Sequence, residues 1–367
     1  MRRAYQYRLC PTPTQQERLD WTLDRCRELY NACVQERRDA YRMCGVSVGF
    51  YEQKRQLPAI KDARPEYKEI GSQVLQNVVE RVDKAFVAFF RRIKARQKAG
   101  YPRFKGRDRY DSFTFTQAGW ALVEGRLRLG GIGSVKVRWS RPIQGRIKTV
   151  TIRRDADHWY ASFSCEVDHV APSAPDKPAI GIDMGLEHFA TLSTGKHIAN
   201  PRHFRGGEAL LARRQQSLAR KKRGSNRRKK AKLLVAKAHR KVRNQRRDFH
   251  HKAANGVVAQ AGAIAVESLN TAGMVKNHSL AKSISDAGWA QFLTMLGYKA
   301  EGAGVQVIAV NPSGTSQACS ACGAVVRKDL STRWHTCACG ASLQRDVNAA
   351  RIILKRAGLA RQAASVA

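Results

Sequence analysis

The spacing of hydrophobic residues changes along the chain, and each change predicts a different kind of structure. Residues 1–10 alternate between polar and apolar side chains, which predicts a strand. Helical spacing follows over 14–41, and the T-x-x-E pattern at Thr14–Glu17 has the form of a capping box at its start. A second amphipathic helix is predicted between Gly71 and Gly100. The first hundred residues therefore contain one strand and two long helices.

The second helix carries an apolar stripe along one side. Its members recur at helical spacing: Val78, Val82, Phe86, Phe89 and Ile93. Phe86, Phe89 and Phe90 could instead stack on nucleic-acid bases, but aromatic residues at this spacing are more typical of a core. We therefore interpret the stripe as core packing.

Alternating spacing resumes between residues 100 and 167 and predicts several short strands. The alternating positions are Phe113 and Phe115, then Val135, Val137 and Trp139, then Trp159, Ala161, Phe163, Cys165 and Val167. Short strands at this spacing indicate a small β-barrel, to which the strand at 1–10 belongs. The two helices are then an insertion. Basic and aromatic residues are interleaved over 101–109 and offer an edge for a nucleic-acid backbone.

A Pro/Ser-rich linker, 171–177, precedes the second part of the chain. The run AIGIDMGLEHFATL, 179–192, predicts a buried strand and a hairpin partner joined at Gly185. One carboxylate, Asp183, lies inside this run. A buried carboxylate costs several kcal/mol unless it is paired or binds a cation. The alternative is an aspartate hydrogen-bonded within its own turn.

Two further buried strands follow, at 261–266 and 305–310, with a helix predicted over 285–302 between them. This strand–helix–strand order predicts a right-handed parallel crossover. Glu267 comes directly after the first of these strands, and a final helix opens with Asp346 near its start.

The charge of the chain indicates the kind of partner. Its 367 residues include 67 Lys+Arg and 29 Asp+Glu, a net charge of +38, and such self-repulsion implies a polyanion. No apolar run has the length of a membrane span and the first residues lack the apolar core of a signal peptide, so we expect nucleic acid, in the cytoplasm, and no membrane. The most basic segment is 202–247. Charge of one sign cannot form ion pairs along a helix, so we favour phosphate contact over a merely solvated face. By the same reasoning, His250 and His251 are predicted to face phosphates.

Four of the nine cysteines lie close together in the sequence: Cys319, Cys322, Cys337 and Cys339. The first pair is a C-x2-C-G zinc knuckle, whereas the second is C-x-C, one residue shorter. In an extended strand, residues two apart face the same way, so the second pair could still bind one ion, and His335 is a possible substitute ligand. A closed site of four protein ligands is structural. The alternative is four unrelated thiols in a reducing compartment.

Three carboxylates form the candidate catalytic set: Asp183, Glu267 and Asp346. If they converge, their oxygens are the ligands that Mg²⁺ prefers. Two such ions could activate an attacking water and stabilise the leaving oxygen of a phosphodiester.

These motifs resemble those of a known family. GIDMG with Asp183, VESLN with Glu267 and RDVNAA with Asp346 resemble the three motifs of a RuvC-type nuclease domain. KSISDAGWAQF at 282–292 and TSQACSACG at 315–323 are similar to TnpB, the transposon-encoded RNA-guided DNA endonuclease related to type V CRISPR effectors. With RLCPTPTQ and YPRFKG, the resemblance runs over nearly the whole chain.

The resemblance implies a mixed α/β and β fold class. It implies an RNase H-like (RuvC) nuclease domain with an inserted zinc ribbon, and an N-terminal β-barrel (wedge) domain interrupted by a helical recognition lobe. The implied ranges are 1–13 and 101–170 for the wedge, 14–100 for the lobe, 171–317 and 341–367 for the nuclease, and 318–340 for the ribbon.

The resemblance also implies the activity: RNA-guided, Mg²⁺-dependent DNA cleavage with a two-ion site, a structural Zn²⁺ and a guide RNA from the transposon end. The implied partners are this RNA and double-stranded target DNA, with the protein as a monomer near the bacterial nucleoid. In the family the protein reads a short adjacent motif in duplex DNA. Residues that match those contacts are Gln76, Thr116 and Gln117, and, as weaker matches, Phe50 and Lys54.

Two departures from the family pattern stand out. The second cysteine pair is C-x-C, and Gln344 stands where many members carry Asp. The triad itself is complete, which disfavours the alternative of a catalytically silent RNA-guided or zinc-ribbon regulator. A third hypothesis is an RNase H-like transposase, which would give strand-joined products.

Overall fold

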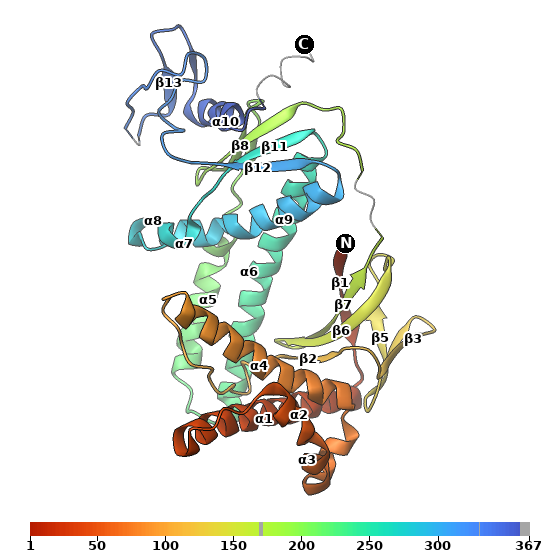
Figure 1. The fold of residues 1–367 in the computed structure, drawn as a ribbon. Coiled ribbons are helices and arrows are strands. Elements are labelled where there is room, and N and C mark those ends of the chain that lie inside the picture. The colour runs from red at the N-terminus through yellow and green to blue at the C-terminus, as the bar shows by residue number, and fades with distance from the viewer. Residues whose placement is uncertain (169–171, 330, 360–367) are drawn as a thin grey trace. The chain divides into compact units, whose positions relative to one another are not determined.

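The computed structural model describes residues 1–168, 172–329 and 331–359. The chain divides into two compact units, Met1–His169 and Val170–Ala367 (Figure 1). The predicted domain boundary at 170–171 and the end of the predicted nuclease range, 360–367, lie outside the described residues. Each unit is described by itself.

The first unit combines a seven-stranded antiparallel sheet with a group of helices. Its elements are β1 (Arg2–Cys10), α1 (Pro13–Cys44), α2 (Phe50–Arg55), α3 (Leu57–Ala63), η1 (Pro65–Glu69), α4 (Ser72–Lys94), β2 (Ser112–Phe115), β3 (Trp120–Val123), β4 (Arg126–Leu129), β5 (Gly133–Arg138), β6 (Arg146–Asp155) and β7 (His158–Glu166). The strand order is β2-β6-β7-β1-β5-β4-β3. Because β1 pairs with β5 and β7, the first strand does belong to the sheet formed after residue 100.

The two edge strands of this sheet are neighbours in the sequence. β2 ends at Phe115 and β3 begins at Trp120, so a short turn connects opposite edges of the sheet. A chain spans at most about 3.5 Å per residue, and the sheet must therefore curl until its edges approach each other. Phe113, Trp159 and Phe163 are fully buried in the core of this unit. The result is the curled sheet expected from the alternating pattern.

Helix α1 has a different cap from the predicted one. The Thr12 hydroxyl accepts a hydrogen bond from the Gln15 N–H at 3.3 Å, and Gln15 Oε1 accepts one from the Thr12 N–H at 3.0 Å. The prediction of a cap at Thr14 and Glu17 was therefore wrong. Pro13 occupies the first helical position, where its missing N–H has no partner to lose.

Helix α4 buries only the first part of its apolar stripe. Val78 and Phe86 are buried, whereas Phe90 is 58% exposed and Ile93 is 50% exposed. The core cluster of this unit ends at Phe86 on this helix, so the last turns lie beyond it. The prediction of core packing holds for Phe86 and was wrong for Phe90 and Ile93.

The second unit is built on a five-stranded mixed sheet of order β10-β9-β8-β11-β12. Its elements are β8 (Ala179–Met184), β9 (His188–Leu192), β10 (His197–Ala199), α5 (His203–Ala219), α6 (Asn226–Val258), β11 (Ala263–Glu267), α7 (Thr271–Met274), α8 (His278–Ala287), α9 (Trp289–Gly302), β12 (Gln306–Val310), β13 (Trp334–Thr336), β14 (Ser342–Gln344) and α10 (Arg345–Arg356). β8 and β9 are antiparallel, which confirms the predicted hairpin. β11 is parallel to both β8 and β12, which confirms the parallel pairing of the crossover.

Helices cover both faces of this sheet (Figure 1). α10 packs on one face through Ile353, and α6 and α9 cover the other, where Phe292 is buried. Gly181 lets α10 approach β8 closely, because a Cβ there would lie 2.0 Å from the Ala350 carbonyl oxygen. Side chains alternate along a strand, so Asp183, two residues beyond Gly181, lies on the α10 face.

Two regions of this unit each contain parts of two helices. The basic segment 202–247 forms α5 and most of α6. The helix predicted over 285–302 is interrupted at Gly288, whose φ of +66° is a left-handed conformation that glycine adopts easily. Judged by length and apolar content, no helix within the described ranges could cross a membrane.

The strands β13 and β14 form an antiparallel hairpin that leads directly into α10. β14 lies at Ser342–Gln344. This strand follows residue 340, the predicted end of the ribbon.

Candidate active site and metal centre

The structure places the three candidate carboxylates around one edge of the second sheet. Asp183 lies near the end of β8, and Glu267 is the last residue of the adjacent parallel strand β11. Asp346 lies in the first turn of α10. Alternation along β11 puts Ala265 in the core beneath α10, so Glu267 lies on that face too.

The charges of these carboxylates act on one another. Burial, followed by the negative charges of Glu267 and Asp346, raises the pKa of Asp183 to about 8, against the opposing charge of Arg345. A carboxyl with a raised pKa and two acidic neighbours is a place where a cation is stabilised. Among the described residues, only the four cysteines have ligand atoms that all lie within 4.8 Å of one another. The three carboxylates do not form such a group within the described residues.

Glu267 is buried and is oriented by a threonine. The Thr315 hydroxyl, itself 5% exposed, donates a hydrogen bond to Glu267 Oε1 at 2.6 Å. Burial raises the pKa of Glu267, and the Thr315 hydroxyl partly offsets this. Thr315 lies 48 positions from Glu267, and no pattern in the sequence indicates this contact.

Asp346 is flanked by an arginine. Arg345 Nε lies 3.4 Å from Asp346 Oδ1, and its Nη1 donates to the Thr332 carbonyl at 3.0 Å. A carboxylate in a first helical turn is also stabilised by the helix dipole. In the sequence, only its position next to Asp346 indicated that Arg345 belongs to the site.

Without divalent cations, the folded protein is expected to lose stability as the pH rises toward 8. The unfolded chain releases the Asp183 proton at about pH 4, whereas the folded state keeps it up to about pH 8. The stabilising effect of that proton is therefore present at low pH and lost as the pH rises through this window. Asp183→Asn stays neutral throughout. In EDTA, wild type should lose on the order of 4 kcal/mol of unfolding free energy relative to this variant between about pH 5 and about pH 8.5. A constant difference would contradict the raised pKa.

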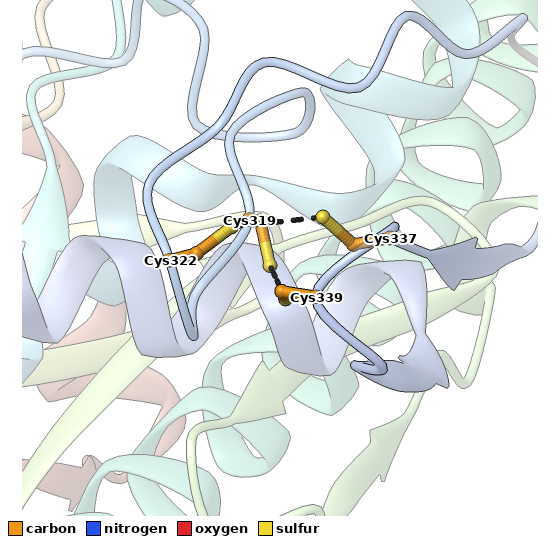
Figure 2. Close-up of side chains that lie close together, drawn as sticks. All are labelled: Cys319, Cys322, Cys337 and Cys339. Atoms are coloured by element: carbon orange, nitrogen blue, oxygen red, sulfur yellow. Dashed lines mark hydrogen bonds between the residues drawn. The ribbon is translucent and has the colours of Figure 1, made fainter.

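The chain segment that connects β12 to α10 brings four cysteine sulfurs together, as predicted (Figure 2). The sulfurs of Cys319 and Cys339 are 3.7 Å apart, and those of Cys322 and Cys337 are 3.6 Å apart. A tetrahedral ion with thiolates at about 2.3 Å has sulfur–sulfur edges of about 3.8 Å. The cluster therefore has the dimensions of a four-coordinate metal site.

The C-x-C pair enters the cluster through a turn and not through the extended strand predicted for it. β13 ends at Thr336, and the Gly340 N–H then donates to the Cys337 carbonyl at 3.0 Å. In the first pair, the Gly323 N–H donates to the Cys319 carbonyl at 2.9 Å. Both glycines have positive φ, which explains how each knuckle turns sharply behind its cysteines.

His335 lies beside the cluster, where it is fully buried. The pKa of the Cys319 thiol is lowered to about 5, mainly by a hydrogen bond from the backbone N–H of Cys322. Burial opposes this shift, and a hydrogen bond with His335 lowers the pKa further. This sulfur is therefore a thiolate at neutral pH, the form that binds metals. Four sulfurs complete the ligand set, so His335 is not needed as a substitute ligand.

A pocket of about 450 Å³ lies beside the loop that follows Asp183. Three arginines from two parts of the chain line it: Arg202 and Arg205 at the start of α5, and Arg333. Arg333 is paired with Glu187 at 3.3 Å. The pocket therefore offers guanidinium groups to a phosphate next to the candidate active site.

The basic helices α5 and α6 pack on each other through a small core of Leu211, Ala238 and Val242. Leu233 and Leu234, also on α6, are 36% and 47% exposed. The helix pair thus presents a long surface of mostly basic side chains.

His250 does not contribute to this surface, contrary to the prediction. It is fully buried, its Nε2 donates to the Ala287 carbonyl at 2.8 Å, and its ring stacks on Phe189 at 5.4 Å. Burial lowers its pKa, so it is a neutral core histidine. His250 lies on the buried, apolar side of α6. The basic residues next to it in the sequence do not reveal that side, which explains why the prediction was wrong.

The residues matched to a DNA motif lie on α4, on α2 and in the turn between β2 and β3. Gln73 Oε1 of α4 accepts hydrogen bonds from the Thr116 hydroxyl at 3.0 Å and from the Gln117 N–H at 2.6 Å. Gln76 lies three residues after Gln73, on the same face of α4. Gln73, which no sequence motif indicates, therefore links the turn to α4, the helix that carries Gln76.

Phe50 and Lys54 form a separate pair on α2. The Lys54 ammonium lies 5.9 Å from the Phe50 ring, and Phe50 packs partly against the core. Within the described ranges, no hydrogen bond joins either residue to the turn at Thr116.

Three protein-family models match the chain. One described as "Probable transposase" matches residues 162–278, one described as a Cas12f1-like TNB domain matches 289–353, and one described as a helix-turn-helix domain matches 1–45. In the last range the structure has β1 and the single 32-residue helix α1.

Among solved structures, the complex of Cas12f1 with sgRNA and target DNA aligns with 93% of this chain and 82% of that chain, at a TM-score of 0.58 and 14% identity. The chain therefore has the fold class of the compact Cas12f-type proteins. Its sequence relatives narrow this further. A Streptomyces pristinaespiralis protein named "Putative RNA-guided DNA endonuclease" is 35% identical over 99% of this chain and 91% of its own. An Escherichia coli K12 protein, "Putative RNA-guided DNA endonuclease InsQ", is 30% identical over 96% of this chain and 91% of its own. The chain belongs to the TnpB family, also called IS605 OrfB.

Proposed function

We propose that this protein is a transposon-encoded RNA-guided DNA endonuclease that hydrolyses guide-matched DNA next to a short motif. Two relatives that match nearly the whole chain carry RNA-guided DNA endonuclease in their names. The observation that carries the proposal is the raised pKa of Asp183, caused by burial and by the charges of Glu267 and Asp346. Structural carboxylates are normally paired with cations, so three acids kept close to one another indicate an ion-binding site.

We assign Asp183, Glu267 and Asp346 as the ligands of a two-ion Mg²⁺ site in an RNase H-like (RuvC) nuclease domain. The donor set fits, because it consists of carboxylate oxygens, the ligands that Mg²⁺ prefers. Bound there, Mg²⁺ supplies Lewis-acid stabilisation of the charge that develops on the phosphodiester oxygens.

The protein groups around this site hold the ligands and set their protonation. Thr315 fixes one oxygen of Glu267, and Asp183 must release its proton before it can bind a cation. Cleavage is therefore expected to become faster as the pH rises toward 8. Water attacks phosphorus and releases a proton to solvent, the opposite phosphorus–oxygen bond breaks, and the departing oxygen takes a proton from solvent. No covalent enzyme intermediate forms.

Two surfaces would hold the nucleic acids. The α5–α6 surface and the arginine pocket would contact the guide RNA and the heteroduplex through their phosphates. In the first unit, Gln76, Thr116 and Gln117 would read the adjacent motif, with Phe50 and Lys54 nearby on α2.

The proposed layout follows from these roles. Residues 1–13 and 101–170 would form the wedge, 14–100 the recognition lobe, and the remaining chain the nuclease with its ribbon. Zn²⁺ is the metal that four thiolates at tetrahedral spacing favour, and with no open coordination position its role is structural. We propose a monomer that binds one guide RNA.

The function is tested with the protein purified together with its own RNA, which is then sequenced to define the matching target. Matched DNA should be cut with Mg²⁺ and remain intact with EDTA, and mismatched DNA should remain intact in both. Binding without any cut would support the regulator, and strand-joined products would support the transposase.

A further inference from the structure

Asn348 on α10 is fully buried, and both ends of its amide are bonded to the first cysteine knuckle. Its Oδ1 accepts a hydrogen bond from the Ser320 N–H at 2.8 Å, and its Nδ2 donates to the Ala318 carbonyl at 2.7 Å. These two backbone groups flank Cys319, which is also fully buried. One side chain of α10 therefore holds both sides of a metal-binding cysteine.

The turn of α10 that makes this clamp also carries Asp346, two residues earlier. The segment that enters the knuckle contacts a second carboxylate, because Thr315 donates to Glu267 at 2.6 Å. At the other side of the ribbon, the Arg345 N–H donates to the Arg333 carbonyl at 2.9 Å. Hydrogen bonds therefore connect the segment of the cysteine ribbon to Glu267, and to Arg345 and Asn348 on either side of Asp346.

We propose that Asn348 is a positioning residue through which metal bound by the four cysteines sets the position of Asp346. The inference goes beyond the proposed function and rests on it for the role of Asp346. A ribbon this short has little core of its own, so its shape depends on the bound metal. When that metal is lost, the backbone groups that Asn348 holds move, and the first turn of α10 loses its anchor. Supports of this kind outside the ligand set alter metal affinity strongly.

The test compares Asn348→Ala with Lys355→Ala in the full-length protein bound to its RNA. Lys355 also joins α10 to the ribbon, by a bond from its Nζ to the Ala321 carbonyl at 3.2 Å, but this bond is exposed and lies nearly three turns from Asp346. Asn348→Ala should keep the zinc content of wild type and raise the Mg²⁺ concentration for half-maximal cleavage by about 10-fold or more. Lys355→Ala should stay within about twofold of wild type. Asn348→Asp keeps the acceptor but sets a buried carboxylate oxygen against the Ala318 carbonyl, so it should raise the Mg²⁺ requirement at least as much as Asn348→Ala. If neither variant folds, zinc removal from wild type still tests the coupling.

Hydrogen exchange in α10 separates this inference from the proposed function. Stripping zinc from wild type should speed exchange at the start of α10, and zinc-loaded Asn348→Ala should already show that faster exchange. If wild type cuts no DNA, the proposed function fails while this comparison still tests the coupling. If zinc-loaded Asn348→Ala keeps both the wild-type Mg²⁺ requirement and slow exchange, the coupling through Asn348 is wrong.

Discussion

Asp183→Asn is expected to lower the rate of guide-directed DNA cleavage by about 10³-fold or more, with little change in RNA binding. The substitution keeps the size of the side chain and removes the charge at the centre of the carboxylate set. Loss of several kcal/mol of stabilisation of the developing phosphate charge corresponds to this factor. The basic surface of α5 and α6 is untouched, so the affinity for guide RNA should stay within about twofold.

The matched control is Asp62→Asn, the same chemical change at an aspartate whose side chain is 74% exposed on α3. It should cut at the wild-type rate. Single-turnover cleavage, RNA binding and thermal melting are measured on both variants. Because the pKa of Asp183 is raised, Asp183→Asn should also be at least as stable as wild type in EDTA at about pH 8. Cleavage by Asp183→Asn within about tenfold of wild type would remove Asp183 from the active site.

The sequence was informative where one local pattern decides the structure. The apolar runs around Asp183 and before Glu267 predicted buried strands, and both strands lie in the core of the sheet. The strand–helix–strand order predicted that β11 and β12 are parallel, as observed. Asp183 and Glu267 meet at one end of the sheet because β11 is also parallel to β8, a pairing that the strand–helix–strand order did not predict.

The contacts that support the site could not be predicted in this way. Thr315 reaches Glu267 across 48 positions, and Asn348 reaches Ser320 across 28. Neither residue belongs to an apolar stripe or to a ligand pattern, so only the folded chain reveals its partner. The same holds for Gln73, whose bond to the turn at Thr116 depends on how α4 packs on the sheet.

The predictions were wrong where one sequence pattern is compatible with two different structures. For the C-x-C pair, an extended strand and a tight turn can both direct two thiols to one ion, and Gly340 selects the turn. For His250, the basic neighbours on α6 suggested a phosphate contact, although its own position faces the core. A helix that is basic on one side is still apolar on the other.

Cys322→Ser is expected to lose the metal of the ribbon and, with it, most of the protection of residues 317–344 against hydrogen exchange. The four sulfurs are held together by few other contacts, and a serine oxygen replaces a thiolate poorly as a soft ligand. Binding to a structural zinc site contributes folding free energy directly, so the hairpin of β13 and β14 should open. Zinc content should fall from about one ion per chain to well below half, and cleavage should fall by about 10-fold or more if Asn348 transmits the loss.

Two controls separate this effect from cysteine loss in general and from histidine ligation. Cys44→Ser changes an exposed cysteine at the end of α1 and should keep the zinc content, the exchange pattern and the cleavage rate of wild type. His335→Gln should also retain zinc, because Cys319, Cys322, Cys337 and Cys339 already supply four ligand atoms within 4.8 Å. If His335→Gln loses zinc while Cys322→Ser keeps it, the metal is held by the histidine and the four-sulfur assignment is wrong.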